Sequence, residues 1–458
     1  MPLIVIYNPV SGDRTAAKLT TDTILPLLAT HNVTPDKVAA TEYAGHAGTL
    51  LLSYIDGLIS AEPITLVLVS GDGTLHEIVN ALHGARIKQE RTFPALRIAL
   101  IPGGTANALY STFFPPPPST SESSTGTAQA EPTVLASLLS FLSATPRLVP
   151  LTFARTSIYV SPPALSGSEN PDAAPISSAS ESHPDVLSAV VISTALHAAI
   201  LHDSEALRAS VPGIERFKLA AAQNDTRWYR ARARLLAPVQ RYDLSADAFV
   251  SVSEEEEPLE LSGPFVYFLS TVNVDRLEPL FRIAPLQRAL PPPPGAQTMD
   301  VLVVRPLRDP SLEGKSGEEE RKRFKESVWS VIGSAYQDGA HIKARYESQD
   351  GKTDGLPVVE YFRVGGWEWI PVGLPLKHVT LFDADDRSGR RRRESAPLMR
   401  GRSNIQGFGR RENYIKRAGE DGPRTERISV CLITLEVHTH QTSGYHYICA
   451  AKCFTTGD

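Results

Sequence analysis

Residues 69–80 place a carboxylate between two glycines, in the order Val-Ser-Gly-Asp-Gly-Thr-Leu-His-Glu-Ile-Val-Asn. Gly71 and Gly73 permit a close approach by other backbone atoms, and the N–H groups that open the following helix at Thr74 attract an anion. A carboxylate beside bound phosphate is repelled unless it holds Mg²⁺ or takes a proton. An enzyme that transfers phosphoryl groups needs both a metal ion and a group that accepts a proton. Asp72 therefore predicts a site for phosphoryl transfer.

The turn lies between an expected strand and an expected helix. Residues 64–69 read Ile-Thr-Leu-Val-Leu-Val, a short apolar run that is typical of a strand buried on both faces of a parallel sheet. Beyond the turn, apolar residues repeat at helical spacing from Leu75 to Leu82. We therefore expect the chemistry at the carboxyl end of a strand.

Two further strand ends carry turns of the same kind. Residues 3–12 read Leu-Ile-Val-Ile-Tyr-Asn-Pro-Val-Ser-Gly, and residues 98–107 read Ile-Ala-Leu-Ile-Pro-Gly-Gly-Thr-Ala-Asn. One such turn is a common connection between a strand and a helix. Three of them near the beginning of one chain predict that three strand ends converge on one ligand.

In this order, the motifs resemble the diacylglycerol kinase catalytic-domain family. The segments that carry the resemblance are Tyr-Asn-Pro-Val-Ser-Gly at 7–12, Thr-Glu-Tyr-Ala-Gly-His-Ala at 41–47, the turn and helix at 70–80, and Pro-Gly-Gly-Thr-Ala-Asn-Ala at 102–108. Ser70 and Glu77 favour the sphingosine kinase branch. The resemblance covers nearly all of residues 1–113 and becomes patchy further along the chain.

The resemblance implies an ATP-dependent lipid kinase that acts on a sphingoid base or diacylglycerol. ATP and Mg²⁺ are the expected cofactors, and Asp72 is the expected base for the lipid hydroxyl. By resemblance, the nucleotide is surrounded by Asn8, Ser11, Gly12, Thr41, Gly71, Gly73, Thr74, Glu77, Gly104, Thr105 and Asn107. The lipid is expected at a membrane surface.

Two segments, 203–208 and 213–219, resemble the family's helical pair that brings basic residues to the phosphates. Arg208 and Arg216 are the candidates, because guanidinium groups suit the charge on phosphoryl oxygens. The alternative is that both arginines are solvated charges on a helix face.

The expected contacts with the lipid and the metal depart from the family pattern. By resemblance, the sphingosine branch has an Asp that meets the sphingoid amine where this chain has Leu201. The adjacent His202 and Asp203 are the candidate substrate contacts. Asp300 is the candidate metal ligand by resemblance, with a turn residue at a strand start as the alternative.

The predicted fold is an α/β N-terminal domain with a parallel sheet of βαβ units, followed by a mostly antiparallel β-sandwich or barrel. We predict an ATP-binding domain over 1–146, a β-rich lipid-substrate domain over 147–371, and a divergent or mistranslated basic tail over 372–458. Residues 115–132 and 161–184 are of low complexity and are predicted to be disordered insertions. Expected strands of the second domain cover 187–194, 230–236, 248–252, 264–272, 299–304, 341–346 and 358–364. One more strand is expected in the tail, at 428–438.

Composition points to an intracellular enzyme without a nucleic-acid partner. The net charge of the 458 residues is −5, so the chain as a whole has no excess of positive charge with which to bind a nucleic acid. The three cysteines all lie in the last thirty residues, so no disulfide framework is expected. Neither a signal peptide nor an apolar run of membrane-spanning length is evident. We expect a cytoplasmic protein with peripheral membrane association, and leave its oligomeric state open.

Two other functions fit parts of the sequence. A metabolite kinase of the NAD kinase type shares a Gly-Asp-Gly turn, although the Asn-Pro-Val-Ser-Gly element argues against it. A catalytically impaired, lipid-binding relative fits the tail, where a basic stretch that includes Arg390–Arg393 follows the last recognisable strand.

Overall fold

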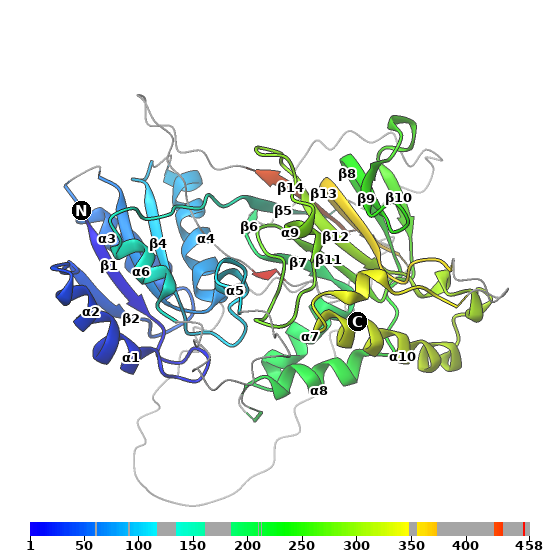
Figure 1. The fold of residues 1–458 in the computed structure, drawn as a ribbon, viewed down its shortest axis with the longest axis horizontal. Coiled ribbons are helices and arrows are strands. Elements are labelled where there is room, and N and C mark those ends of the chain that lie inside the picture. Colours follow the sequence, from blue (N-terminus) through cyan, green and yellow to red (C-terminus); the bar gives the residue numbers. More distant parts are fainter. Residues whose placement is uncertain are drawn as a thin grey trace, which may run out of the picture.

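The computed structural model describes residues 1–59, 62–89, 92–116, 134–160, 185–208, 210–211, 213–347, 355–372, 426–433 and 452–453. These residues form a four-stranded sheet and an eleven-stranded sheet, at the left and right of Figure 1. Every strand pairing in the first sheet is parallel, and in the described part of the second sheet every pairing except that of β15 with β7 is antiparallel. The predicted fold class is confirmed.

The first sheet has the strand order β2-β1-β3-β4. Its strands are β1 (Leu3–Tyr7), β2 (Lys37–Ala40), β3 (Ile64–Ser70) and β4 (Leu96–Pro102). Its helices are α1 (Ala16–Leu19), α2 (Leu25–Thr30), α3 (His46–Asp56), α4 (Asp72–Gln89), α5 (Ala108–Phe113) and α6 (Ala136–Leu142), with a π-helical turn (Thr20–Ile24) between α1 and α2. Helix α4 begins at Asp72, so the carboxylate lies in its first turn.

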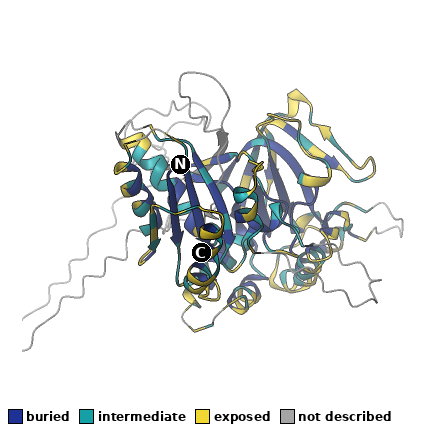
Figure 2. Ribbon diagram, turned by 60° about the vertical axis from the view of Figure 1, so that its left-hand side comes forward, coloured by how far each residue is buried: buried dark blue, intermediate teal, exposed yellow. Residues whose placement is uncertain are grey.

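The period of two along the strands places this sheet between two layers of helices. In β1, Leu3 and Val5 pack in a cluster with residues of α1, α2 and α6, whereas Ile4 and Ile6 pack with residues of α3, α4 and α5. Strand β3 is buried along its whole length because it pairs with β1 and β4 and is covered on both faces. Figure 2 shows the strands mainly in the buried colour and the outer helices partly exposed.

The second sheet has the path β15-β7-β11-β12-β13-β14-β5-β6, with β8 pairing β13 and carrying β9 and β10. Its strands are β5 (Phe153–Val160), β6 (Val186–Ser188), β7 (Val191–Thr194), β8 (Ala231–Asp243), β9 (Ala248–Ser251), β10 (Leu259–Ser262), β11 (Tyr267–Thr271), β12 (Met299–Val304), β13 (Glu360–Pro371), β14 (Glu426–Ile433) and β15 (Lys452–Cys453). The accompanying helices are α7 (Ala195–Ala206), α8 (Glu215–Asn224), α9 (Leu286–Ala289) and α10 (Glu318–Ala335), with short 3₁₀ turns at Glu254–Glu256, Pro306–Arg308, Pro310–Leu312 and Ala340–Lys343. Among the described residues, no helix is both long enough and apolar enough to cross a bilayer.

Strand β13 organises the second sheet, because its two halves have different neighbours on one edge. Its first half pairs with β12, its second half pairs with β14, and β8 follows the opposite edge. The register shifts between Val364 and Gly366, where a Cβ on Gly365 would lie 2.1 Å from the Ala237 carbonyl oxygen. Beyond the shift, the fully buried Trp367 donates its indole N–H to Ser270 Oγ at 3.0 Å. The bulge thus lets one strand serve two parts of the sheet.

Part of the tail belongs to the second sheet. Strand β14 contains the first half of the strand expected at 428–438 and lies between β13 and β5. Residues 434–438 lie outside the described residues, as do most of the predicted tail and both predicted insertions except Pro115 and Pro116. The proposed domain boundaries stay predictions.

The strand expected at 341–346 is wrong. Residues Ala340–Lys343 form a 3₁₀ helix instead, and His341 is fully buried with its Nε2 3.0 Å from the Ile283 carbonyl oxygen. Burial lowers the pKa of His341 to about 4, although the bond to the Ile283 backbone opposes this change. The contact between His341 and Ile283, which the local sequence does not reveal, favours the 3₁₀ helix.

His341 should make the protein less stable in mild acid. Between the ordinary histidine pKa of 6.5 and about 4, the unfolded chain binds a proton that the folded chain does not, so stability falls as the pH falls through this window. From pH 7 to pH 5 the loss from this one group is on the order of 2 kcal/mol. Urea unfolding at both pH values should show a clearly smaller loss for His341→Gln than for the wild type. His31→Gln, at an exposed histidine, is the control and should keep the full loss; equal losses in all three proteins would contradict the assignment.

Candidate active site

The turns after β1, β3 and β4 meet backbone to backbone. A Cβ on Gly104 would lie 2.4 Å from Gly71 Cα, and a Cβ on Gly71 would lie 2.8 Å from Gly104 Cα. Gly12 has φ +49°, and a Cβ there would lie 2.6 Å from the Gly103 carbonyl oxygen. Since any side chain would collide with another turn, glycine is required at these three positions. The structure brings the three predicted turns together.

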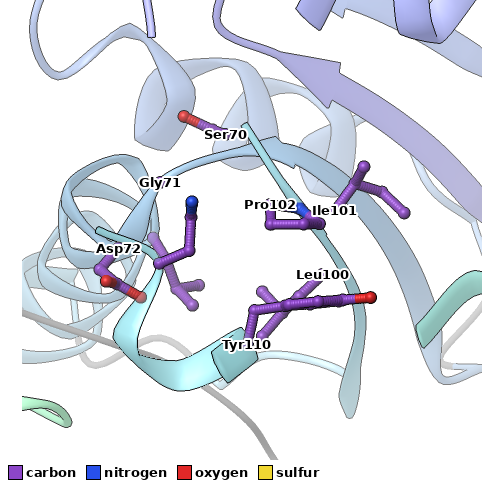
Figure 3. A pocket seen from close by; sticks show the side chains of 9 residues that line it. Ser70, Gly71, Asp72, Leu100, Ile101, Pro102 and Tyr110 are labelled. Atoms are coloured by element: carbon purple, nitrogen blue, oxygen red, sulfur yellow. The ribbon is translucent and has the colours of Figure 1, made fainter. Parts of the chain in front are cut away.

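Asp72 joins the second turn to the third. Its Oδ2 accepts a hydrogen bond from the Ala108 N–H at 2.7 Å, and its Oδ1 accepts one from the Leu109 N–H at 3.3 Å. The carboxylate thus lies at the start of α4 and caps the start of α5, toward which it points in Figure 3. An ionised carboxylate oxygen can accept more than one hydrogen bond, so these two bonds do not by themselves prevent Asp72 from accepting a proton.

Asn107 fixes the third turn. Its Oδ1 accepts a hydrogen bond from the Gly104 N–H at 2.8 Å, and its Nδ2 donates to the Gly104 carbonyl oxygen at 2.7 Å. The residue has φ +53°, a left-handed conformation that Asn tolerates better than most residues. Thr105 is exposed inside the loop that this pair of bonds closes.

Polar side chains tie the first turn to the second. Ser70 Oγ and Thr74 Oγ1 are 2.6 Å apart, and Asn8 Nδ2 donates to Thr74 Oγ1 at 3.3 Å. Ser11 follows in the same turn, where its N–H donates to the Asn8 carbonyl oxygen. The buried Thr41 lies after β2, and its N–H donates to the last residue of β1 at 2.9 Å.

Glu77 lies one turn along α4 from Gly73 and connects this helix to the loop before α3. Burial raises the pKa of its carboxyl group, and a hydrogen bond from the Gly45 backbone opposes the change. Gly45 is the residue that precedes α3. The segment at 41–47, which contributes to the family resemblance, is therefore held against the helix that begins at Asp72.

A small recess opens beside Asp72, between the ends of β3 and β4 and the start of α5 (Figure 3). It is lined by Ser70, Gly71, Asp72, Leu75, Leu100, Ile101, Pro102, Asn107 and Tyr110. Tyr110, which the sequence did not single out, is buried, and this burial raises the pKa of its hydroxyl. Its place in the first turns of α5 is the only signal that could have indicated it.

The α7–α8 pair brings the two predicted arginines near one another. Arg208 is exposed and donates to Glu205 at 2.6 Å. Arg216 is 7% exposed, and its guanidinium carbon lies 4.7 Å from the centre of the Phe217 ring. Burial lowers the pKa of Arg216, and the positive charge of Arg208 lowers it further. Acidic residues of the same hairpin offset part of this charge, because Arg208 pairs with Glu205 and Lys218 pairs with Glu215.

Asp203, which is bonded to its neighbour His202, joins the same two helices. His202 Nδ1 is 2.8 Å from Asp203 Oδ1, and Asn224 Nδ2 on α8 donates to Asp203 Oδ2 at 2.7 Å. Burial works against ionisation of Asp203, but the hydrogen bonds from Asn224 and His202 outweigh it and lower the pKa. The carboxylate thus already holds α7 to α8. Leu201 is buried on α7.

Asp300 does not fit the role of a metal ligand. It is 2% exposed, and its two oxygens accept hydrogen bonds from Arg363 Nε at 2.7 Å and from the Tyr361 hydroxyl at 2.6 Å. An oxygen engaged in this way inside a core is not open to a cation. Within the part of the chain that the structure describes, no three or more His, Cys, Asp or Glu residues are grouped to hold a metal. Mg²⁺ would therefore enter with phosphate groups rather than bind to a preformed cluster of side chains in this part of the chain.

Comparison with known proteins identifies the first domain. Residues 2–136 match the family model of the diacylglycerol kinase catalytic domain. The N-terminal domain belongs to this family. Sphingosine kinase 1 of Arabidopsis thaliana is 31% identical over 120 residues, a match that spans 25% of this chain and 22% of that relative.

Two solved structures of proteins from Bacillus anthracis str. Sterne are among those similar to this chain. A diacylglycerol kinase from Bacillus anthracis str. Sterne has 15% sequence identity and a TM-score of 0.39, and the match covers 82% of this chain and 88% of that one. A proposed diacylglycerol kinase from the same strain has 12% identity and a TM-score of 0.41, with 94% of each chain covered.

Gly104→Ala tests the contact between the turns. The added methyl group must push Gly71 away, so the free energy of unfolding should fall by roughly 1 to 3 kcal/mol. Gly73→Ala is a matched control, because a Cβ there meets nothing within 4 Å and alanine favours the first turn of α4. Chemical unfolding of both variants measures the difference. Equal stability of Gly104→Ala and the wild type would contradict the close approach.

Proposed function

We propose that this chain is an ATP-dependent lipid kinase, which transfers the γ-phosphoryl group of ATP to a lipid hydroxyl. The observation that carries the proposal is the position of Asp72. Its carboxylate lies where three glycine turns meet, inside a domain of the diacylglycerol kinase catalytic-domain family. A carboxylate that faces bound phosphate serves phosphoryl transfer better than simple phosphate binding.

The glycine turns suit the phosphates of the nucleotide. Gly12, Gly71 and Gly104 keep side chains out of the junction, and the N-terminus of α4 adds a partial positive charge. The proposed nucleotide contacts are those predicted from the sequence, from Asn8 to Asn107. Arg208 and Arg216 would add charge from the second domain. Mg²⁺, when bound, would neutralise the β- and γ-phosphates.

In the proposed reaction the lipid hydroxyl oxygen forms a bond to the γ-phosphorus, the bond from that phosphorus to the β–γ bridging oxygen breaks, and ADP leaves. Asp72 accepts the proton of the hydroxyl group. A free alcohol is too weak an acid to ionise beforehand, so the proton moves late in the reaction. Most of the rate enhancement would then come from positioning and electrostatics.

The proposed acceptor is a sphingoid base or diacylglycerol, taken from a membrane surface by a cytoplasmic protein. The relative from Arabidopsis thaliana is named a sphingosine kinase, which supports the first. Leu201, where that branch has an Asp by resemblance, provides no charge for a sphingoid amine, which supports a neutral lipid alcohol. His202 and Asp203 stay candidate contacts with the lipid substrate.

Asp72→Asn should reduce phosphoryl transfer by about 10² to 10⁴. The assay follows radiolabelled phosphate from ATP to sphingosine, diacylglycerol, ceramide and NAD, each offered separately. ATP binding and the free energy of unfolding are measured on the same samples, because Asp72 also caps α5. Asp22→Asn, at an exposed pair with Lys18, is the control and should retain full activity. Label on NAD alone would contradict lipid phosphorylation, and unchanged lipid labelling by Asp72→Asn would contradict its role as the base.

Arg216→Gln should raise the KM for ATP by about tenfold, because a charged hydrogen bond to phosphate contributes about 1.5 to 3 kcal/mol. Arg241→Gln is the matched control, since Arg241 also lies over an aromatic ring, at 5.7 Å from Phe362, but belongs to β8. Steady-state kinetics with varied ATP separate the two. An equal KM in both variants would assign Arg216 a structural role only.

A further inference from the structure

The helix that begins at Asp72 is bonded to the second sheet through Asn80. The Asn80 Nδ2 donates to the Leu187 carbonyl oxygen at 3.0 Å, and its Oδ1 accepts a hydrogen bond from the Leu187 N–H at 2.9 Å. The side-chain amide thus satisfies both backbone groups of a residue in β6, as a neighbouring strand would. Asn80 lies two turns beyond Asp72 on α4.

His76 supports this contact from one turn earlier on the same face of α4. Its Nδ1 is 3.1 Å from Asn80 Nδ2, and its ring also bonds to the Leu187 backbone. Burial lowers the pKa of His76 to about 4, so the ring is neutral at pH 7. A neutral ring can accept or donate at this site without placing a charge in the contact.

Apolar packing surrounds the polar contact. Leu187 is fully buried, and its cluster also contains Leu75, Ile78 and Val79 of α4. Strand β6 pairs with β5, which continues into the second sheet through β14. A displacement of β6 relative to α4 would therefore break the two hydrogen bonds between the Asn80 side chain and the Leu187 backbone, and would open an apolar core.

We infer that Asn80 is a positioning residue that docks the second domain onto the helix carrying Asp72, with His76 orienting its amide. The inference rests on the proposed function, in which the second domain presents the lipid hydroxyl to Asp72. Loss of the contact should lower kcat, because the acceptor then spends less time in line with the phosphoryl group. The KM for ATP should change little, because the turns of the first domain hold the nucleotide.

Asn273 offers a matched control. Its Oδ1 accepts a hydrogen bond from the Thr152 N–H at 3.0 Å, and its Nδ2 donates to the carbonyl oxygens of Thr152 and Ala189 at 2.7 and 2.8 Å. It is the same kind of amide-to-backbone clamp, but it joins segments beside β5, β6 and β11, all of the second sheet. Asn273→Ala should cost similar stability and leave α4 bonded to β6.

The experiment compares Asn80→Ala, Asn80→Asp and Asn273→Ala in the full-length chain by hydrogen–deuterium exchange and by lipid-kinase kinetics. Asn80→Asp keeps the size of the side chain but turns a carboxylate oxygen toward the Leu187 carbonyl oxygen. Both Asn80 variants should increase exchange at residues 185–190 and at the turn 70–75, and should lower kcat by about tenfold or more, with the KM for ATP within about threefold of the wild type. Asn273→Ala should keep the wild-type exchange at 70–75 and most of kcat.

The possible failures are distinguishable. A wild type that labels no lipid overturns the proposed function, and the docking contact is then judged by exchange alone. Wild-type exchange at 185–190 in Asn80→Ala shows that the contact does not hold the domains and overturns the inference. An active wild type whose kcat falls equally in the Asn80 and Asn273 variants also overturns it, because the effect would then be one of general stability.

Discussion

The approach of Gly71 to Gly104 is the constraint on which the other features of the site depend. With no Cβ on either residue, the turns after β3 and β4 come close enough for the Asp72 carboxylate to reach the first N–H groups of α5. The same proximity requires the tight Gly-Gly-Thr loop that Asn107 closes. Any side chain larger than hydrogen at the contact would separate the starts of α4 and α5, and with them the groups proposed to surround the phosphates.

Helix α4 connects these turns to the second sheet. Its first residue is Asp72, its apolar face enters a core that continues into the second sheet, and Asn80 binds the backbone of β6. A rigid helix of this length carries displacement at one end to the other. The position of β6 and the orientation of the Asp72 carboxylate are therefore linked through one helix, and the motif at 69–80 contains the residues that determine both.

The sequence predicted the features that depend on local pattern. Apolar runs and glycine turns identified β1, β3 and β4 and the carboxylate between them, because strand burial and left-handed or crowded turns constrain residue type directly. Contacts between distant segments were not predictable in this way. Asp300 was a candidate metal ligand by resemblance, but it is bonded to Arg363, which lies 63 residues further along the chain. A strand was expected at 341–346, yet Ala340–Lys343 form a 3₁₀ turn in which His341 bonds to a carbonyl group 58 residues away.

The two hydrogen bonds on Asp72 are compatible with action as a late base. They hold the carboxylate in one orientation, so no free energy is needed to orient it when the hydroxyl oxygen begins to bond to phosphorus. They also disperse its negative charge onto the N-terminus of α5, which reduces repulsion between Asp72 and the incoming γ-phosphate. A loose transition state requires little basicity until the oxygen–phosphorus bond has formed, because only then does the hydroxyl proton become acidic. A fixed and partly neutralised carboxylate therefore suits phosphoryl transfer better than a free and strongly basic one.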